Sequence, residues 1–151
     1  METCLSNIRF KDITITFKNI VHMFNQEKLV ETLNRIEGYK TRLKELHWSS
    51  PSHSFHIIID EYSGDIAEFE DALAENSIAL LDFVRPGDLS PVLPEDTDFE
   101  SLLCSVRALL SSLKEECENL CWSGIVNLID DFWTTTNRYV YLAKISSHQA
   151  E

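Results

Sequence analysis

The stretch that decides the fold is LKELHWSSPSHSFHIIIDEYSGDIAEFEDALAE, residues 43–75. One helical pattern ends near His47 and Trp48, and a second, longer pattern begins after the Ser- and Pro-containing break that follows. Large apolar residues recur at helical spacing on one side of the second pattern: Phe55, Ile59, Tyr62, Ile66, Phe69 and Leu73. That side predicts packing into the chain's own core.

A different side of the same helix carries His56, Asp60, Asp71 and Glu75. At about 100° per residue, the three carboxylates lie near 40°, 60° and 100° from His56, so all four residues share one stripe. Imidazole and carboxylate are metal ligands. The two i,i+4 pairs are about 22 Å apart along the helix, too far for one metal ion. Two copies packed antiparallel across a two-fold axis would join the pairs into two equivalent sites.

The residues around the expected crossing point, near 65 and 66, fit a close approach of two helices. Small residues lie on or beside the stripe: Ser63, Gly64, Ala67 and Ala74. The helix is therefore expected to have one face for its own core and another for a second copy. The alternative is that the four polar residues are ordinary solvated positions in an acidic protein.

The segment before this helix adds a further pattern, because His47-Trp48 ends the preceding helix. Counted from His56, acidic residues follow at plus four, plus fifteen and plus nineteen. This pattern resembles the Dps family of mini-ferritins, in which a helix ends in His-Trp and the next helix carries His, Asp, Asp and Glu at these steps. The specific similarity covers residues 43–80, and a looser four-helix pattern extends to about residue 145.

The resemblance implies an inter-subunit iron-oxidising centre with non-haem iron, in single or di-iron form. It assigns the catalytic and metal-ligand roles to His47, His56 and Asp60 of one subunit and to Asp71 and Glu75 of its two-fold mate. His47 also suits a histidine that stabilises the C-terminal end of its helix. The family assembles as a hollow dodecamer, although one sequence does not count subunits.

These features favour a ferroxidase-type oxidoreductase that oxidises Fe(II) with peroxide or oxygen and stores iron if its subunits close into a shell. The rival interpretation is a ferritin-like structural or adaptor subunit of a larger assembly, for example a virion, with little or no ferroxidase activity.

The rest of the chain predicts an all-α protein. Helical patterns cover about 25–48 and 54–81; a third begins after a capping box of Thr97 and Glu100, and a fourth begins near Trp122. The connection between the first and second helices is short, and so is the one between the third and fourth. The connection between the second and third helices is long enough to cross a bundle end to end. We therefore expect a ferritin-like four-helix bundle with one long crossover, over residues 25–146. Residues 1–24 fit an N-terminal arm or an extra helix, and 147–151 a tail.

Composition narrows the choice of partners. The net charge is −12, with 25 acidic against 13 basic residues, which argues against direct DNA binding because that depends on Lys and Arg neutralising phosphates. No apolar run approaches the roughly 18 residues of a membrane span, and Met1-Glu2-Thr3-Cys4 lacks the basic n-region leading into an apolar stretch that is typical of a signal peptide. A cytoplasmic protein, or one inside a larger intracellular assembly, is expected. Cys117 and Cys121 fit buried thiols of a reducing compartment better than a zinc site.

Overall fold

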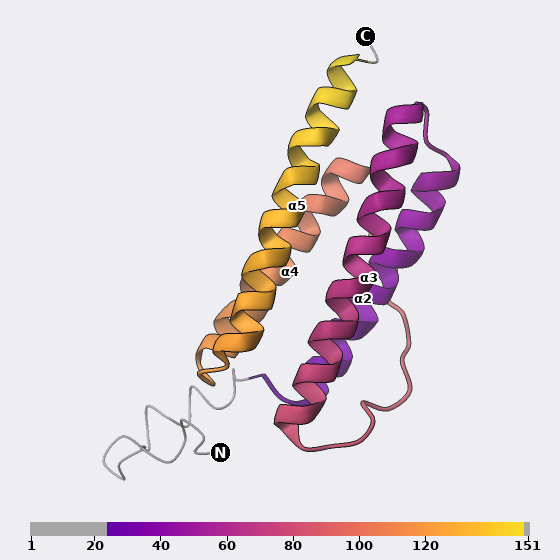
Figure 1. The fold of residues 1–151 in the computed structure, drawn as a ribbon. Helices are drawn as coiled ribbons and strands as arrows, with labels where there is room; N and C mark the ends of the chain where they lie inside the picture. Colours follow the sequence, from indigo (N-terminus) through magenta and orange to yellow (C-terminus); the bar gives the residue numbers. More distant parts are fainter. Residues whose placement is uncertain (1–23, 150–151) are drawn as a thin grey trace.

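The computed structural model describes residues 24–149, which fold into four helices (Figure 1). These are α2 (Gln26–Trp48), α3 (His53–Leu81), α4 (Phe99–Glu118) and α5 (Ser123–Gln149). The described residues contain no strand, so the expected all-α class is confirmed. α5 continues to Gln149, past the boundary expected at residue 146.

The four helices form a bundle in which each helix has two neighbours. α2 packs on α3, α4 on α5, and the two pairs meet through α3 with α5 and, more loosely, through α2 with α4. The apolar side of α3 predicted from the sequence is buried, including Ile59, Tyr62 and Leu73. The expected four-helix bundle is therefore confirmed, and its hydrophobic core lies between all four helices.

Each of the first three helices begins at a side chain that accepts a hydrogen bond from a backbone N–H left unpaired in the first turn. Asn25 accepts from Lys28 N at 2.9 Å, and Ser52 accepts from Phe55 N at 3.2 Å. At the start of α4 the cap is Asp98, which accepts from Ser101 N at 2.8 Å. The sequence pattern placed this cap at Thr97. Asp98 displaces it because a carboxylate is at least as good an acceptor at that position.

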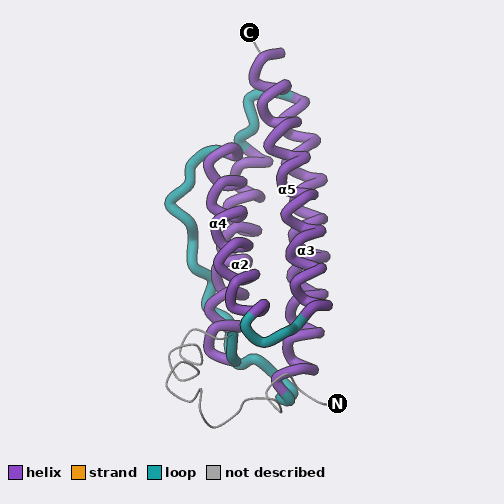
Figure 2. Tube along the Cα trace, turned by 90° about the vertical axis from the view of Figure 1, so that its left-hand side faces the viewer, coloured by secondary structure: helices purple, strands orange, loops and turns teal. Residues whose placement is uncertain are grey.

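The connection between α3 and α4, residues 82–98, lies against the outside of α2. Val92 N donates to Asn34 O at 3.0 Å, and Ser90 N donates to the Asn34 side chain at 2.8 Å. Arg42 donates to Pro94 O at 3.1 Å. Figure 2 shows this connection as a loop along the side of the bundle. It is therefore bound to the fold by its backbone.

Gly38 of α2 makes room for this connection. A Cβ atom at Gly38 would lie 1.7 Å from the Val92 carbonyl oxygen, far inside any allowed contact. Glycine is thus required here for close backbone approach rather than for an unusual φ angle.

Two buried tyrosines join α3 to α5. The Tyr62 hydroxyl lies 3.0 Å from the Thr136 hydroxyl, and Tyr139 donates to Asp65 Oδ2 at 2.7 Å. Burial raises the pKa of both phenols. Both hydroxyls are therefore neutral hydrogen-bonding groups within the bundle.

The predicted arm or extra helix of residues 1–24 falls almost wholly outside the described residues. Phe24 is described, and its buried ring packs edge-on against Trp122 with centroids 5.9 Å apart. Across residues 24–149, no helix has both the length and the hydropathy that a membrane crossing needs.

Candidate metal centre

The turn between α2 and α3 brings His47 and His56 together. Ser49 closes α2 by donating both its N–H and its hydroxyl to Glu45 O, at 3.1 and 2.8 Å. Ser52 then caps the start of α3. The last turn of α2 and the first turn of α3 therefore lie beside each other, with one histidine on each.

The two imidazole rings are stacked, with centroids 3.9 Å apart and an interplanar angle of 24°. His47 Nδ1 lies 3.2 Å from His56 O, and His56 Nδ1 lies 3.2 Å from His47 O. A carbonyl oxygen can only accept, so in each bond Nδ1 carries the proton. In the neutral tautomer with this proton, the ring keeps its Nε2 lone pair for a ligand.

Such bonds are typical of histidines that bind metals, because a backbone carbonyl on one ring nitrogen orients the other nitrogen and makes it more basic. His47 is half-buried, whereas His56 is exposed. The pairing of His47 with His56 is therefore a preorganised two-imidazole group at the end of the bundle.

The three candidate carboxylates lie on the exposed side of α3. Asp60 is one turn beyond His56, and Asp71 and Glu75 lie farther along the helix. All three are exposed, and within residues 24–149 none of them has a hydrogen bond or ion pair. Their oxygens are therefore available to ligands.

One chain does not bring all five candidate residues together. The fifteen-residue separation of the two i,i+4 pairs persists because α3 is a single continuous helix from His53 to Leu81. Within the described part of the chain, no three His, Cys, Asp or Glu side chains are close enough to hold a metal ion. A site with all five residues would therefore need a second copy.

The side of α3 that carries these residues is open at its centre. Apart from its two chain neighbours and the nearby backbone of α3, no described atom would lie within 4 Å of a Cβ atom built on Gly64. The Ser63 hydroxyl donates back to Ile59 O at 2.8 Å. Ala67 is half-buried. Ala74, also expected beside the stripe, instead packs partly against the core.

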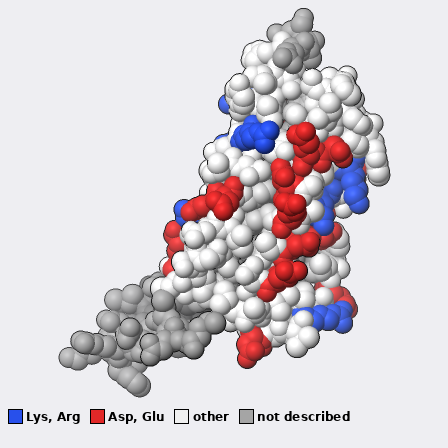
Figure 3. All heavy atoms as spheres, viewed as in Figure 1, with Lys and Arg blue, Asp and Glu red and all other residues white. Residues whose placement is uncertain are grey.

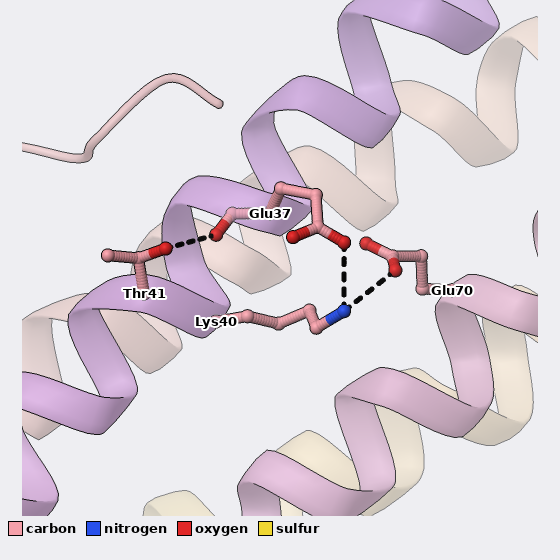
Figure 4. A network of polar contacts seen from close by, with 4 residues as sticks. All are labelled: Glu37, Lys40, Thr41 and Glu70. Atoms are coloured by element: carbon pink, nitrogen blue, oxygen red, sulfur yellow. Dashed lines mark hydrogen bonds and ion pairs between the residues drawn. The ribbon is translucent and has the colours of Figure 1, made fainter. Parts of the chain in front are cut away.

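A polar cluster that the sequence did not predict lies between α2 and α3 (Figure 4). Lys40 donates to Glu37 Oε1 at 2.8 Å and to Glu70 Oε1 at 2.9 Å. Burial raises the Glu70 pKa to about 7, although Lys40 opposes the rise. The hydrogen bond from Lys40 lowers the Glu37 pKa. Burial tends to lower the Lys40 pKa, but both carboxyl groups together leave it raised.

The angular position of Glu70 on its helix could have indicated that this residue lies at the edge of the core. At about 100° per residue it lies near 320° from His56, at the border between the core side and the polar stripe. The Glu37 and Lys40 spacing of three is also a common helical ion pair. Their meeting still depended on how α3 is rotated against α2.

A pocket of about 510 Å³ lies beside the α2–α3 turn. It is lined mainly by Leu46, Phe55, Ile59, Phe99 and the turn residues, and by none of the five candidate ligands. This pocket is mostly apolar and is separate from the candidate ligands. No protein-family model, curated protein or solved structure matches the chain. The resemblance to the Dps family therefore rests only on the residue pattern of α2 and α3.

Proposed function

We propose that this chain is a Dps-type, ferritin-like protein that binds iron and oxidises Fe(II), with peroxide or oxygen, at a site shared by two copies. The reciprocal hydrogen bonding of His47 and His56 is the observation that carries this proposal. It leaves two oriented Nε2 atoms beside an exposed carboxylate helix. Ordinary solvated histidines need no such arrangement.

In the proposed site, His47, His56 and Asp60 of one copy face Asp71 and Glu75 of the other. Imidazole and hard carboxylate oxygens together suit non-haem iron, because they hold the ion through its change of charge and leave positions open for the oxidant. The exposure of all three carboxylates supports this role. If such dimers close into a shell, the oxidised iron is stored inside it.

The α3–α4 connection supports the ferritin-like topology of the proposal. In Figure 1, α3 and α4 run in the same direction, so their connection has to return along the bundle. The contacts of Val92 and Pro94 with α2 fit such a lengthwise course. A single long crossover of this kind distinguishes ferritin-like bundles from simple up-down bundles.

The test is an anaerobic Fe(II) titration followed by peroxide, with the formation of oxidised iron followed by absorbance. The native chain should oxidise Fe(II) faster than buffer alone, and His56→Ala should lose most of the added rate. His53→Ala is the matched control, because His53 is also exposed on the same helix and is not a candidate ligand. A native rate equal to buffer, or equal loss in both variants, would refute the proposed site.

A structural or adaptor subunit remains the second candidate, favoured by the exposed large apolar residues. Trp48 is 76% exposed, Val84 97% and Tyr141 61%. Exposed apolar side chains mark a contact with another protein where they form a contiguous patch. An assembly subunit would form its complexes with no dependence on Asp60 or Glu75 as iron ligands, and the same Fe(II) titration separates the two functions.

A further inference from the structure

The two buried tyrosines that join α3 to α5 have different hydrogen-bond partners. The Tyr139 hydroxyl donates to Asp65 Oδ2 at 2.7 Å, so its proton already points at a carboxylate. The Tyr62 hydroxyl lies 3.0 Å from the Thr136 hydroxyl, and a neutral hydroxyl group is a poor base. The two tyrosine rings are in contact, with centroids 4.9 Å apart. One small part of the core therefore contains one phenol with a base and one phenol without.

The structure describes all four tyrosines of the chain, and the other two also lack a carboxylate partner. The Tyr39 hydroxyl accepts from the Arg35 guanidinium at 3.4 Å. Tyr141 is 61% exposed, and within residues 24–149 its hydroxyl has no hydrogen bond. Tyr139 is therefore the one tyrosine of the described chain whose proton is directed at a carboxylate.

The partner of a tyrosine hydroxyl matters when the ring loses an electron. An oxidised phenol is a strong acid, and its ring keeps a positive charge unless the proton leaves. Such a charge is costly at Tyr139, which is only 2% exposed, because little water solvates it. The Arg138 guanidinium lies 5.9 Å from the centre of the Tyr139 ring and adds to this cost. Oxidation of Tyr139 therefore requires that its proton leave with the electron.

Asp65 is placed to take that proton along the existing hydrogen bond. Proton transfer between two groups needs their heavy atoms to be within about 2.6–3.2 Å, and Tyr139 and Asp65 meet this condition. The product is a neutral phenoxyl radical beside a neutral carboxylic acid. The half-buried Asp65 carboxylate thereby loses its charge, and no new charge is buried.

The charge of α3 favours the same change. This helix contains seven Asp or Glu residues and no Lys or Arg, and Figure 3 shows acidic side chains in a column along it. The negative potential of neighbouring carboxylates makes the loss of an electron easier and the uptake of a proton by Asp65 more favourable.

We propose that Tyr139 is a reversible one-electron redox site with Asp65 as its proton acceptor. A strong one-electron oxidant, such as a trivalent metal complex, takes one electron from the phenol and becomes divalent. The phenol O–H bond breaks, and the proton forms a new O–H bond with Asp65 Oδ2. A one-electron reductant returns the electron, and the proton goes back to the phenol oxygen. The site uses none of the candidate iron ligands and goes beyond the proposed function.

The test oxidises the full chain in EDTA, without iron, by a light flash on tris(bipyridine)ruthenium(II) with persulfate, which yields the trivalent complex. Every sample carries Tyr141→Phe, so that the exposed phenol does not contribute. EPR of freeze-quenched samples, with and without ring-deuterated tyrosine, should show a neutral tyrosyl radical. Tyr139→Phe should lose most of this signal. Tyr62→Phe is the matched control, because it removes a hydroxyl from the neighbouring buried ring, and it should keep the signal.

Asp65→Asn tests the proton acceptor, because the amide keeps an oxygen for the hydrogen bond but is not a base. The rate of tyrosyl formation should fall by about 10-fold or more. Asp131→Asn is the matched control, since it removes a carboxylate from the same groove between α3 and α5, and it should keep the native rate. Circular dichroism checks that each variant is folded.

Two measurements need no change at Asp65. Tyrosyl formation should be slower in D₂O, because the proton moves with the electron. Ascorbate should remove the radical, and a second flash should then restore the same signal.

An unchanged tyrosyl signal in Tyr139→Phe would overturn the proposal, as would a radical confined to tryptophan. A native rate in Asp65→Asn, or equal rates in H₂O and D₂O, would contradict the role of Asp65. A signal that is lost after one cycle would exclude reversibility. These samples contain no iron, so failure of this proposal and failure of the proposed function are separate results.

Discussion

Lys40 of α2 lies 2.9 Å from Glu70 of α3 and pairs with a carboxyl group that is almost wholly buried. The effect of burial on the Glu70 pKa is larger than the opposing effect of Lys40, so this pKa is raised to about 7 from an ordinary value of 4.5. Between pH 4.5 and about pH 7, Glu70 is protonated to a greater extent in the folded chain than in the unfolded chain. The free energy of unfolding should therefore fall as pH rises through this window.

Glu70→Gln should remove that fall, because an amide resembles the protonated carboxyl group and does not ionise. The native chain and the variant should have similar free energies of unfolding at about pH 5. At about pH 8 the variant should be more stable by about 1–3 kcal/mol. Urea unfolding at a series of pH values measures this difference. Glu61→Gln, at an exposed position on the same helix, should leave the native slope unchanged.

The other two members of the cluster act in different pH windows. The lowered pKa of Glu37 contributes stability above its ordinary value of 4.5, and this is lost only as pH falls further. The raised pKa of Lys40 matters only above 10.5. Parallel stability curves for the native chain and Glu70→Gln between about pH 5 and about pH 8 would therefore contradict the assignment to Glu70.

If the proposed shared site is correct, Asp60→Ala and Glu75→Ala should each abolish rapid Fe(II) oxidation, because each removes an anionic ligand from one half of it. Mixing the two proteins is the sharper measurement. In a heterodimer one site carries both substitutions and the other carries neither, so subunit exchange should restore part of the rate.

The control for mixing is the Asp60→Ala protein exchanged with itself, which should stay inactive. If exchange is verified by mass spectrometry and the mixed sample recovers no activity, the site is not shared. Full activity in either single variant would instead favour the structural or adaptor subunit.

Gly64→Leu should weaken the proposed pairing of two copies through α3 while leaving the helical content of the chain intact. Beyond its neighbours and the nearby α3 backbone, no described atom lies within 4 Å of a Cβ at this position, so in the proposed dimer the new side chain would clash with the second copy. Sedimentation velocity measures the pairing, and circular dichroism measures the helix. An unchanged oligomer would show that the two α3 helices do not cross at Gly64.

Gly38→Ala should destabilise the chain by about 1–3 kcal/mol, because the new methyl group would force the Val92 carbonyl away from α2. Gly64→Ala is the matched control in a helix interior with open space. It should be neutral or stabilising by up to about 1 kcal/mol from helix propensity. Thermal unfolding in EDTA compares the two, and equal effects would contradict the close approach.

The sequence was most informative where a property repeats along one helix. The apolar spacing of Ile59, Tyr62 and Leu73 was enough to predict which side of α3 is buried. The cap of α4 was misplaced by one residue, because Thr97 and Asp98 are both good acceptors and the choice depends on the backbone angles at the helix start.

Contacts between separate elements were beyond the sequence pattern. The stacking of His47 on His56 requires one particular conformation of the turn between them. The burial of Glu70 depends on the rotation of α3 against α2, and the need for glycine at position 38 depends on a loop more than fifty residues later in the chain. Each of these features is set by packing, which local spacing does not encode.

Asn34, Gly38 and Arg42 are spaced four residues apart, so they form one stripe on α2, and each of them meets the α3–α4 connection. Asn34 and Arg42 form hydrogen bonds with the backbone of the connection. Gly38, which lies between them, leaves room for the Val92 carbonyl. Sliding the connection by a residue would break the hydrogen bonds and bring a side chain against the backbone in the same step. The loop therefore has a register, as a strand in a sheet does, and an insertion or deletion between Ser90 and Pro94 should be tolerated far less than one between Phe83 and Asp88.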